Sequence, residues 1–306
     1  MIDRHRGNCI LNEGLDPVMN QVDHTFEAFG LTFFPKKVGL VYDSEGLFLN
    51  TFKLRLVYPD ELIVINSLHK FLHNGFNVYD VTYQEMVQGL HKLYSSLPVN
   101  LSTVKISQIE FGCAIQVEQP LDLSQSLLYF ENKPMLQYNE NGNIIGKWHN
   151  AQQYKLKFYS KYHEMAQCLS TLNRFKQSGG DIDYLRKNLR TEFVIKRSRL
   201  LNRATPLSLY DFENKTLIKQ IYLDFHKRCK KLTFQNGTLP SCCNESELFA
   251  SALFENPNIS YQRRLKTMSS IKYDYYKRLY QSFPRAKYEK QRFLEAIEDK
   301  INTLFK

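Results

Sequence analysis

The middle of the chain reads Lys155-Leu-Lys-Phe-Tyr159-Ser-Lys161-Tyr-His-Glu164, a run in which lysines alternate with apolar residues. Alternate side chains of an extended strand project from the same face of a sheet. The lysines up to Lys161 are therefore expected on one face together with Tyr159, and the intervening apolar residues on the other. Nearby positive charge favours the phenolate form of a tyrosine and also binds phosphate.

A second strand-like run reads Leu189-Arg190-Thr-Glu192-Phe-Val-Ile-Lys196. The period of two places Arg190 and Glu192 on one face of a strand expected over residues 189–198. In a purely structural interpretation these residues form cross-strand ion pairs with lysines. In a functional interpretation, tyrosine, basic groups and carboxylates together supply what a metal-assisted attack on a phosphodiester requires.

The preceding part of the chain predicts more strands of an antiparallel sheet. Residues 24–66 alternate between strand-like runs and turn signals, which is typical of a meander. Residues 104–115 form another strand-like run that contains Glu110. Asn141-Gly142 favours a tight hairpin turn shortly before the tyrosine run.

Helices are expected between these strands and after them. Helical spacing of apolar residues follows Thr82, a plausible N-cap, and ends before Pro98. The ranges that predict helices are 83–96, 122–130, 163–187 with a break at 178–180, 207–229, 246–254, and 259–306 with a split near 282–284. The fold class expected is α+β, a central antiparallel sheet flanked by helices with a helical C-terminal module.

Charge is distributed unevenly along the 306 residues, whose net charge is +10. Residues 1–150 contain 11 Lys and Arg against 16 Asp and Glu, a net charge of −5. Residues 151–306 contain 30 against 15, a net charge of +15. A basic half is either a solvated surface or the half that meets a polyanion, and nucleic acid is the commonest such partner.

Several classes of protein are disfavoured by composition. The six cysteines form no Cys-x-x-Cys pair, so neither a zinc site nor a disulfide framework is indicated, and reduced thiols in the cytoplasm are expected. The chain has no apolar run long enough for a transmembrane helix and no apolar signal core at its N-terminus, so no membrane partner is expected.

Three glutamates are candidate metal ligands. Glu110 lies in an otherwise apolar strand, where a carboxylate is costly to bury unless it is paired or bound to a cation. Glu110, Glu192 and Glu164 would suit Mg²⁺ or Mn²⁺ if they converged, because these ions prefer hard oxygen ligands. The alternatives stay open: Glu110 could face solvent, and Tyr159 could be an ordinary packed strand residue.

Several short motifs follow one another in order over about residues 60–215. They are Ser67 to Asp80, Ser107-Gln-Ile-Glu110, Trp148, Tyr159-Ser-Lys161-Tyr-His-Glu164, Leu189-Arg190-Thr-Glu192 and Thr205 to Phe212. In this order the motifs resemble segments of the gene II replication-associated proteins of filamentous phages and, more distantly, the plasmid rolling-circle initiators. Glu110 stands where that family's pattern has Asp, and the first 60 or so residues show little likeness.

The resemblance implies a site-specific DNA endonuclease that initiates rolling-circle replication. Residues 1–215 would be the nicking domain and residues 216–306 a basic helical DNA-binding or accessory module. Tyr159 would attack the scissile phosphate and form a 5′-phosphotyrosine. Lys161 would contact the phosphate or assist the tyrosine, and Arg190 would position the DNA. The glutamates would hold Mg²⁺ or Mn²⁺.

The partners implied by the resemblance are double-stranded origin DNA, single-stranded DNA, and a host helicase and polymerase, in the cytoplasm of a bacterial host. Two other functions fit the same residues. One is a non-catalytic origin-binding or regulatory protein, and the other is a relaxase-like mobilisation protein.

Overall fold

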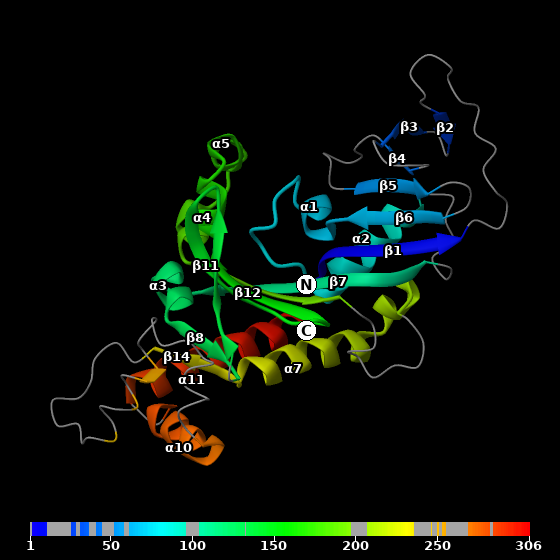
Figure 1. The fold of residues 1–306 in the computed structure, drawn as a ribbon. Coiled ribbons are helices and arrows are strands. Elements are labelled where there is room, and N and C mark those ends of the chain that lie inside the picture. Colours follow the sequence, from blue (N-terminus) through cyan, green and yellow to red (C-terminus); the bar gives the residue numbers. More distant parts are fainter. Residues whose placement is uncertain are drawn as a thin grey trace.

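The computed structural model describes residues 2–10, 26–28, 31–36, 41–44, 52–57, 61–95, 104–131, 133–196, 207–235, 246, 250, 253–254, 269–281 and 284–306. Helices and antiparallel strands build the fold (Figure 1), so the α+β class expected from the sequence is confirmed.

The main sheet has eleven described strands, and every neighbouring pair in it is antiparallel. Its order is β10-β11-β12-β13-β7-β1-β6-β5-β4-β3-β2. The strands are β1 (Ile2–Ile10), β2 (Phe26–Ala28), β3 (Leu31–Pro35), β4 (Val41–Ser44), β5 (Phe52–Val57), β6 (Glu61–Asn66), β7 (Lys105–Gln116), β10 (Leu136–Glu140), β11 (Asn143–Asn150), β12 (Tyr154–Ser160) and β13 (Asn188–Ile195). The two runs singled out in the sequence are therefore adjacent strands, β12 and β13, and β13 lies beside β7.

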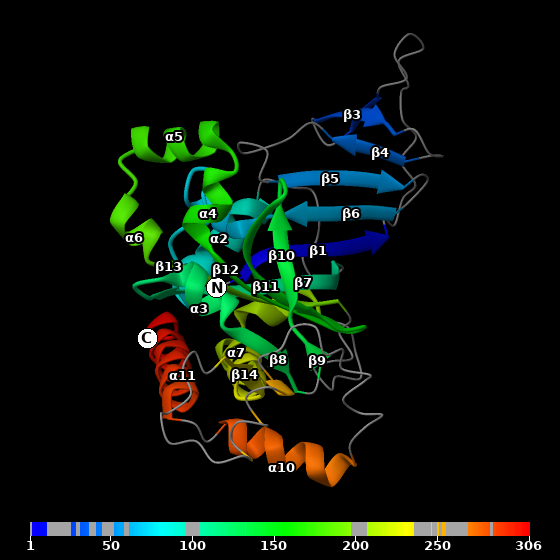
Figure 2. The same ribbon diagram turned by 60° about the vertical axis from the view of Figure 1, so that its left-hand side comes forward.

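The helices divide between the two faces and the ends of this sheet. They are α1 (Leu68–Leu72), α2 (Tyr83–Ser95), α3 (Pro120–Gln125), α4 (Lys161–Ala166), α5 (Leu169–Gln177), α6 (Ile182–Arg186), the 3₁₀ helix η2 (Leu209–Glu213), α7 (Lys215–Cys229), α10 (Ser270–Gln281) and α11 (Pro284–Leu304). Figure 2 shows β3 to β6 and β1 as one continuous part of the sheet, with α4, α5 and α6 gathered on the other side of the molecule.

The central strands have one apolar face. Phe158 of β12 packs against Phe293 of α11, with ring centres 5.8 Å apart, and Phe193 of β13 stacks on Phe225 of α7 at 5.9 Å. Because neighbouring residues of a strand point to opposite faces, the other face carries Tyr159 and its polar neighbours. We call it the polar face: the side of β12, β13 and β7 that bears Lys157, Tyr159, Arg190, Glu192 and Glu110.

Helices α7 and α11 share one hydrophobic core with the sheet. Side chains of β7, β12 and β13 are buried in the same cluster as those of α7 and α11. A small second sheet of β14 (Leu232–Phe234), β8 (Leu127–Phe130) and β9 (Lys133–Pro134) adjoins them. The predicted domain boundary at residue 215 thus falls between two helices, η2 and α7, that pack together.

Local signals in the sequence are confirmed at several places. Thr82 begins α2 as expected, and its hydroxyl accepts a hydrogen bond from the Glu85 N–H while the Glu85 carboxylate accepts one from the Thr82 N–H. Asn141 and Gly142 form the hairpin turn between β10 and β11, with φ of +48° and +82°. The tail splits at Pro284, where α11 begins.

Other expectations were wrong or lie outside the described residues. The range 122–130 is not one helix, because α3 ends at Gln125 and the apolar residues after Ser126 pair with β14 as strand β8. Lys161 does not continue β12, because Ser160 caps a new helix, accepting a hydrogen bond from the His163 N–H. Of the nine residues 246–254, for which a helix was expected, the structure describes residues 246, 250, 253 and 254, and these four are helical.

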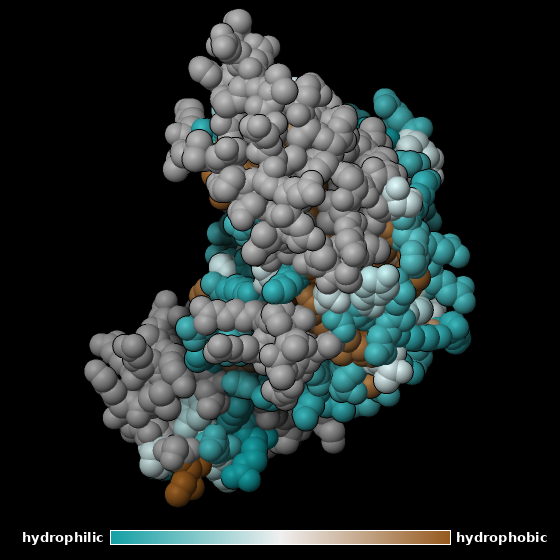
Figure 3. Space-filling view, turned by 90° about the vertical axis from the view of Figure 1, so that its right-hand side faces the viewer, coloured by the Kyte–Doolittle hydropathy of each residue, from teal (hydrophilic) through white to brown (hydrophobic). Residues whose placement is uncertain are grey.

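One face of the described surface is mainly polar (Figure 3). On the face drawn in Figure 3, described residues are mostly hydrophilic, with hydrophobic ones in small separate groups. Among the described helices, none is both long and apolar enough to cross a bilayer.

Candidate active site

Strand register brings four of the six predicted site residues together on the polar face: Tyr159, Arg190, Glu192 and Glu110. Tyr159 lies opposite Arg190, and Lys157 lies opposite Glu192, in the β12–β13 pair. Glu110 of β7 lies opposite Val194 of β13. Directly opposed residues of an antiparallel pair have side chains on the same face, so five charged or phenolic groups meet across three strands.

Tyr159 is buried, with 2% of its surface exposed, and its hydroxyl donates a hydrogen bond to Glu192 Oε1 at 2.6 Å. Its ring packs edge-on against Tyr138, with centres 5.4 Å apart. Gly146 lies between the two tyrosines in the cross-strand row, and a Cβ there would be 2.6 Å from the Tyr159 Cα. The glycine therefore lets the two rings meet over β11.

Only one of these two tyrosines has a carboxylate partner described for its hydroxyl. Burial raises the pKa of Tyr138 to about 12, although Lys157 opposes the shift. Tyr138 consequently stays protonated at neutral pH. The hydrogen bond to Glu192 makes Tyr159 the better candidate for a nucleophile.

Lys157 joins the two central carboxylates. Its Nζ lies 2.5 Å from Glu192 Oε2 and 2.9 Å from Glu110 Oε1. Burial disfavours the charged lysine, but the two carboxylates prevail and raise its pKa. One ammonium thus bridges two buried carboxylates that would otherwise repel each other.

Two of the three predicted metal ligands converge in this way. Glu164 does not join Glu110 and Glu192, because it forms an ion pair with Lys161 in α4. Within the described residues, no group of three or more His, Cys, Asp and Glu side chains is arranged to hold a metal ion. Glu110 and Glu192 still fit Mg²⁺ or Mn²⁺, since Mg²⁺ is often bound by one or two carboxylates with water and substrate phosphates.

Arg190 is fully buried on the polar face, directly opposite Tyr159 in the β12–β13 pair. Its guanidinium lies 3.6 Å from Glu192 Oε1, 3.3 Å from Asp80 Oδ1 and 3.4 Å from His69 Nδ1. Gly112 provides room for it, because a Cβ there would lie 2.9 Å from Arg190 Nη2. The arginine is fixed by its partners and linked to the carboxylate that binds Tyr159.

Asp80 is a site residue that the sequence did not identify. The described pairing of β7 with β1 ends at Phe111, opposite Ile2. A few residues further along β7, the Ala114 N–H donates a hydrogen bond to the Asp80 carboxylate at 3.0 Å. Arg190 reaches it from the polar face, and Lys300 of α11 binds Oδ2 at 2.8 Å. Burial opposes ionisation, but the charges of Lys300 and Arg190 help to hold the pKa of Asp80 below its ordinary value.

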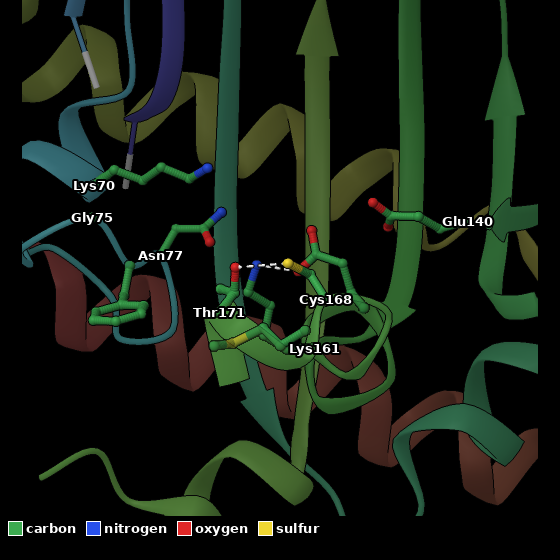
Figure 4. A pocket seen from close by; sticks show the side chains of 10 residues that line it. Lys70, Gly75, Asn77, Glu140, Lys161, Cys168 and Thr171 are labelled. Atoms are coloured by element: carbon green, nitrogen blue, oxygen red, sulfur yellow. Dashed lines mark hydrogen bonds and ion pairs between the residues drawn. The ribbon is translucent and has the colours of Figure 1, made fainter. Parts of the chain in front are cut away.

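Lys161 and Glu164 lie to the side of this network, at the start of α4. Lys161 Nζ is 5.9 Å from the centre of the Tyr159 ring. Both residues line a pocket between α1, α4 and the end of β10 (Figure 4). The position of Lys161 beside the Tyr159 ring fits a phosphate contact next to the tyrosine.

Sequence reasoning found Tyr159, Arg190, Glu192 and Glu110 but missed several of their partners. Lys157 was visible as a lysine on the tyrosine face, but its location opposite Glu192 depends on the register of β12 and β13, which the sequence does not give. Asp80 and His69 lie within the motif Ser67 to Asp80, but nothing local marks them. Lys300 carries no signal in the sequence at all.

Replacing Asp80 with Asn should destabilise the protein by about 3 kcal/mol at pH 7, because it leaves Arg190 and Lys300 without their buried carboxylate. A carboxyl group whose pKa is lowered on folding stabilises the protein above its unfolded pKa of 3.8 and loses that contribution as pH falls through the folded value. The difference between wild type and Asp80→Asn should therefore shrink in acid. Urea denaturation at pH 7 and pH 3 measures this, and an equal difference at both would contradict it.

No model of a known protein family matches this chain, and no curated protein sequence matches it either.

Proposed function

We propose that this protein is a rolling-circle replication initiator that nicks one strand of origin DNA through Tyr159. The observation that carries the proposal is the buried hydrogen bond from the Tyr159 hydroxyl to Glu192, set among Lys157, Lys161 and Arg190. A tyrosine attacks a phosphodiester when a base accepts its proton and cations offset the phosphate charge.

The reaction would proceed by one exchange of bonds at phosphorus. The Tyr159 oxygen forms a bond to the scissile phosphorus while its proton passes to Glu192. The bond from phosphorus to the 3′ oxygen breaks, and that oxygen takes up a proton to become a free 3′-OH. The product is a 5′-phosphotyrosine, and attack by a 3′-OH on it reverses the step and rejoins a strand.

The charges of the site would act on the phosphate. Lys161 lies beside the tyrosine ring and would contact a non-bridging phosphate oxygen, and Arg190 would hold Glu192 in place. Glu110 and Glu192 would be the protein ligands of Mg²⁺ or Mn²⁺. When bound, the ion would supply electrostatic stabilisation of the phosphate.

The surroundings of the site are suited to DNA. The Trp148 indole N–H donates to the Gln137 carbonyl at 2.8 Å, and Lys155 Nζ lies 4.0 Å from the Trp148 ring centre. An aromatic ring with a lysine beside it, on the strand next to the tyrosine, is a suitable contact for single-stranded DNA. Origin DNA, a host helicase and a host polymerase are the partners that this function requires.

A non-catalytic DNA-binding protein is the second candidate. One observation favours it: Tyr159 is 2% exposed and lies in a network of satisfied ion pairs, as a structural residue would. In that case the basic half would bind origin DNA and no strand would be cut. A relaxase-like mobilisation protein would use the same chemistry as the first candidate.

Covalent capture distinguishes these functions. The protein is incubated with Mn²⁺ and a random-sequence single-stranded DNA library labelled at the 3′ end, then denatured in detergent. The nicking function predicts a labelled protein band, because the 3′ fragment stays on the tyrosine, and a modified peptide that contains Tyr159. DNA binding without such a band would support the second candidate, and a modified peptide lacking Tyr159 would refute our assignment of the nucleophile.

A further inference from the structure

The pocket beside the tyrosine contains an unsatisfied acceptor. Oε2 of Glu140 is buried and forms no hydrogen bond within the part of the chain that the structure describes. Glu140 ends β10, and Figure 4 shows its carboxylate pointing across the pocket toward the side occupied by Lys70 and Asn77. A buried carboxylate oxygen without a donor is costly, so the pocket is suited to a ligand that brings N–H groups.

The pocket lining combines acceptors and donors. Glu140 and Glu164 supply carboxylates, whereas Lys70, Asn77 and Thr171 supply an ammonium, an amide and a hydroxyl. Burial raises the pKa of Glu140, and the charge of Glu164 adds to the shift. Two carboxylates in the lining disfavour a free phosphate or another anion as the occupant, even with Lys70 and Lys161 nearby.

Guanine is the nucleobase that matches this lining best. Its N1–H and N2–H₂ donors lie side by side and can both bind one carboxylate, while its O6 and N7 acceptors suit a lysine or an amide. Adenine and cytosine each offer one exocyclic amino group, and thymine offers a single N–H. An unpaired base is required, because the N1–H, N2–H₂ and O6 groups of guanine bind cytosine in a duplex.

The pocket is connected to the tyrosine by two side chains. Lys161 lines it and lies over the Tyr159 ring, and Tyr138, two residues before Glu140 in β10, packs against the same ring. A nucleotide bound here would therefore be a close neighbour of the phosphate that Tyr159 attacks. We infer that this pocket binds an unpaired guanine next to the scissile phosphate, with Glu140 as its specificity-determining residue; this inference rests on the proposed function.

Binding of short oligonucleotides without metal tests the inference apart from nicking. The probes are fluorescent dT oligonucleotides of 12 residues with one central guanine, inosine or adenine, titrated in EDTA and followed by anisotropy. Inosine lacks only the N2 amino group of guanine. We expect wild type to bind the guanine probe about tenfold more tightly than either other probe, the discrimination typical of one bidentate base contact.

Glu140→Gln should bind all three probes with dissociation constants within about twofold of one another, because the amide cannot accept both guanine N–H groups. Glu118→Gln is the matched control: Glu118 is exposed, pairs with Lys187 at 2.9 Å and does not line the pocket. It should keep the tenfold preference. Equal affinities in wild type, an unchanged preference in Glu140→Gln, or a loss of preference in both variants would each overturn the inference.

The two proposals fail in different ways. A guanine preference that depends on Glu140, without any covalent adduct, would refute the nicking function. The inference that the pocket binds guanine would still stand. An adduct at Tyr159 without a guanine preference would refute the pocket and leave the nicking function intact.

Discussion

Tyr159→Phe should abolish nicking and covalent attachment to DNA, a loss of at least about 10³-fold, because no oxygen remains to attack the phosphate. DNA binding should change little, since the ring still packs against Tyr138 and the surrounding cations are intact. Stability should fall by only about 1–2 kcal/mol, because Glu192 loses one hydrogen bond but keeps Lys157 and Arg190. Covalent capture and anisotropy on the same preparation measure both quantities.

The matched control is Tyr138→Phe. Tyr138 lies in the same cross-strand row and touches the same ring, but burial keeps its hydroxyl protonated. This variant should form the covalent adduct at a rate within about tenfold of wild type, as expected for a neighbour that supplies no reacting atom. If Tyr159→Phe still formed an adduct, or if only Tyr138→Phe lost it, Tyr159 would not be the nucleophile.

Side-chain direction in β12 and β13 could be predicted from sequence because it is a local property. A period of two is enough to place Lys157 and Tyr159 on the same face of β12. It likewise places Arg190 and Glu192 on the same face of β13, whatever lies around these strands. Which residue faces which was not predictable, because register depends on pairing between distant segments. That is why the bridge from Lys157 to both Glu192 and Glu110 emerged only from the structure.

Lys161 shows where the local rule ends. The alternation continues through it, but Ser160 offers a side-chain acceptor to the His163 N–H and starts a helix instead. Asp80 shows a different limit. It lies in an irregular segment at the open edge of β7, and its partner Lys300 comes from the last helix, so no periodic pattern connects the two.

The contact from Lys300 to Asp80 bears on how the chain is organised. The resemblance implied that the basic C-terminal helices form a DNA-binding or accessory module. In the structure, α11 also places one lysine against the carboxylate that holds Arg190, which in turn contacts Glu192. The last helix therefore supports the candidate site, and changes in α11 are expected to affect it.

Lys157→Met should have the largest effect on stability, a loss of about 3–5 kcal/mol at pH 7, because it removes the ammonium that lies between two buried carboxylates and offsets their repulsion. Glu192 is 2% exposed and Glu110 is 9% exposed, so water cannot replace the ammonium easily. Urea denaturation measures the loss. Lys155→Met is the control on the same strand and face: it removes a cation from the Trp148 ring and should cost about 0.5–1 kcal/mol.

The same variant tests the predicted metal ligands without any assay of nicking. With the ammonium gone, Glu110 and Glu192 should bind Mn²⁺, and Mn²⁺ at ten times its dissociation constant should restore about 1.4 kcal/mol. Wild type should gain less, because Lys157 competes with the ion for both carboxylates. Equal stability of the Lys157→Met and Lys155→Met variants would show that the carboxylates do not depend on Lys157. If Lys157→Met is destabilised but Mn²⁺ does not stabilise it, Glu110 and Glu192 are not a metal-ligand pair, since the Lys157 ammonium no longer competes with the ion.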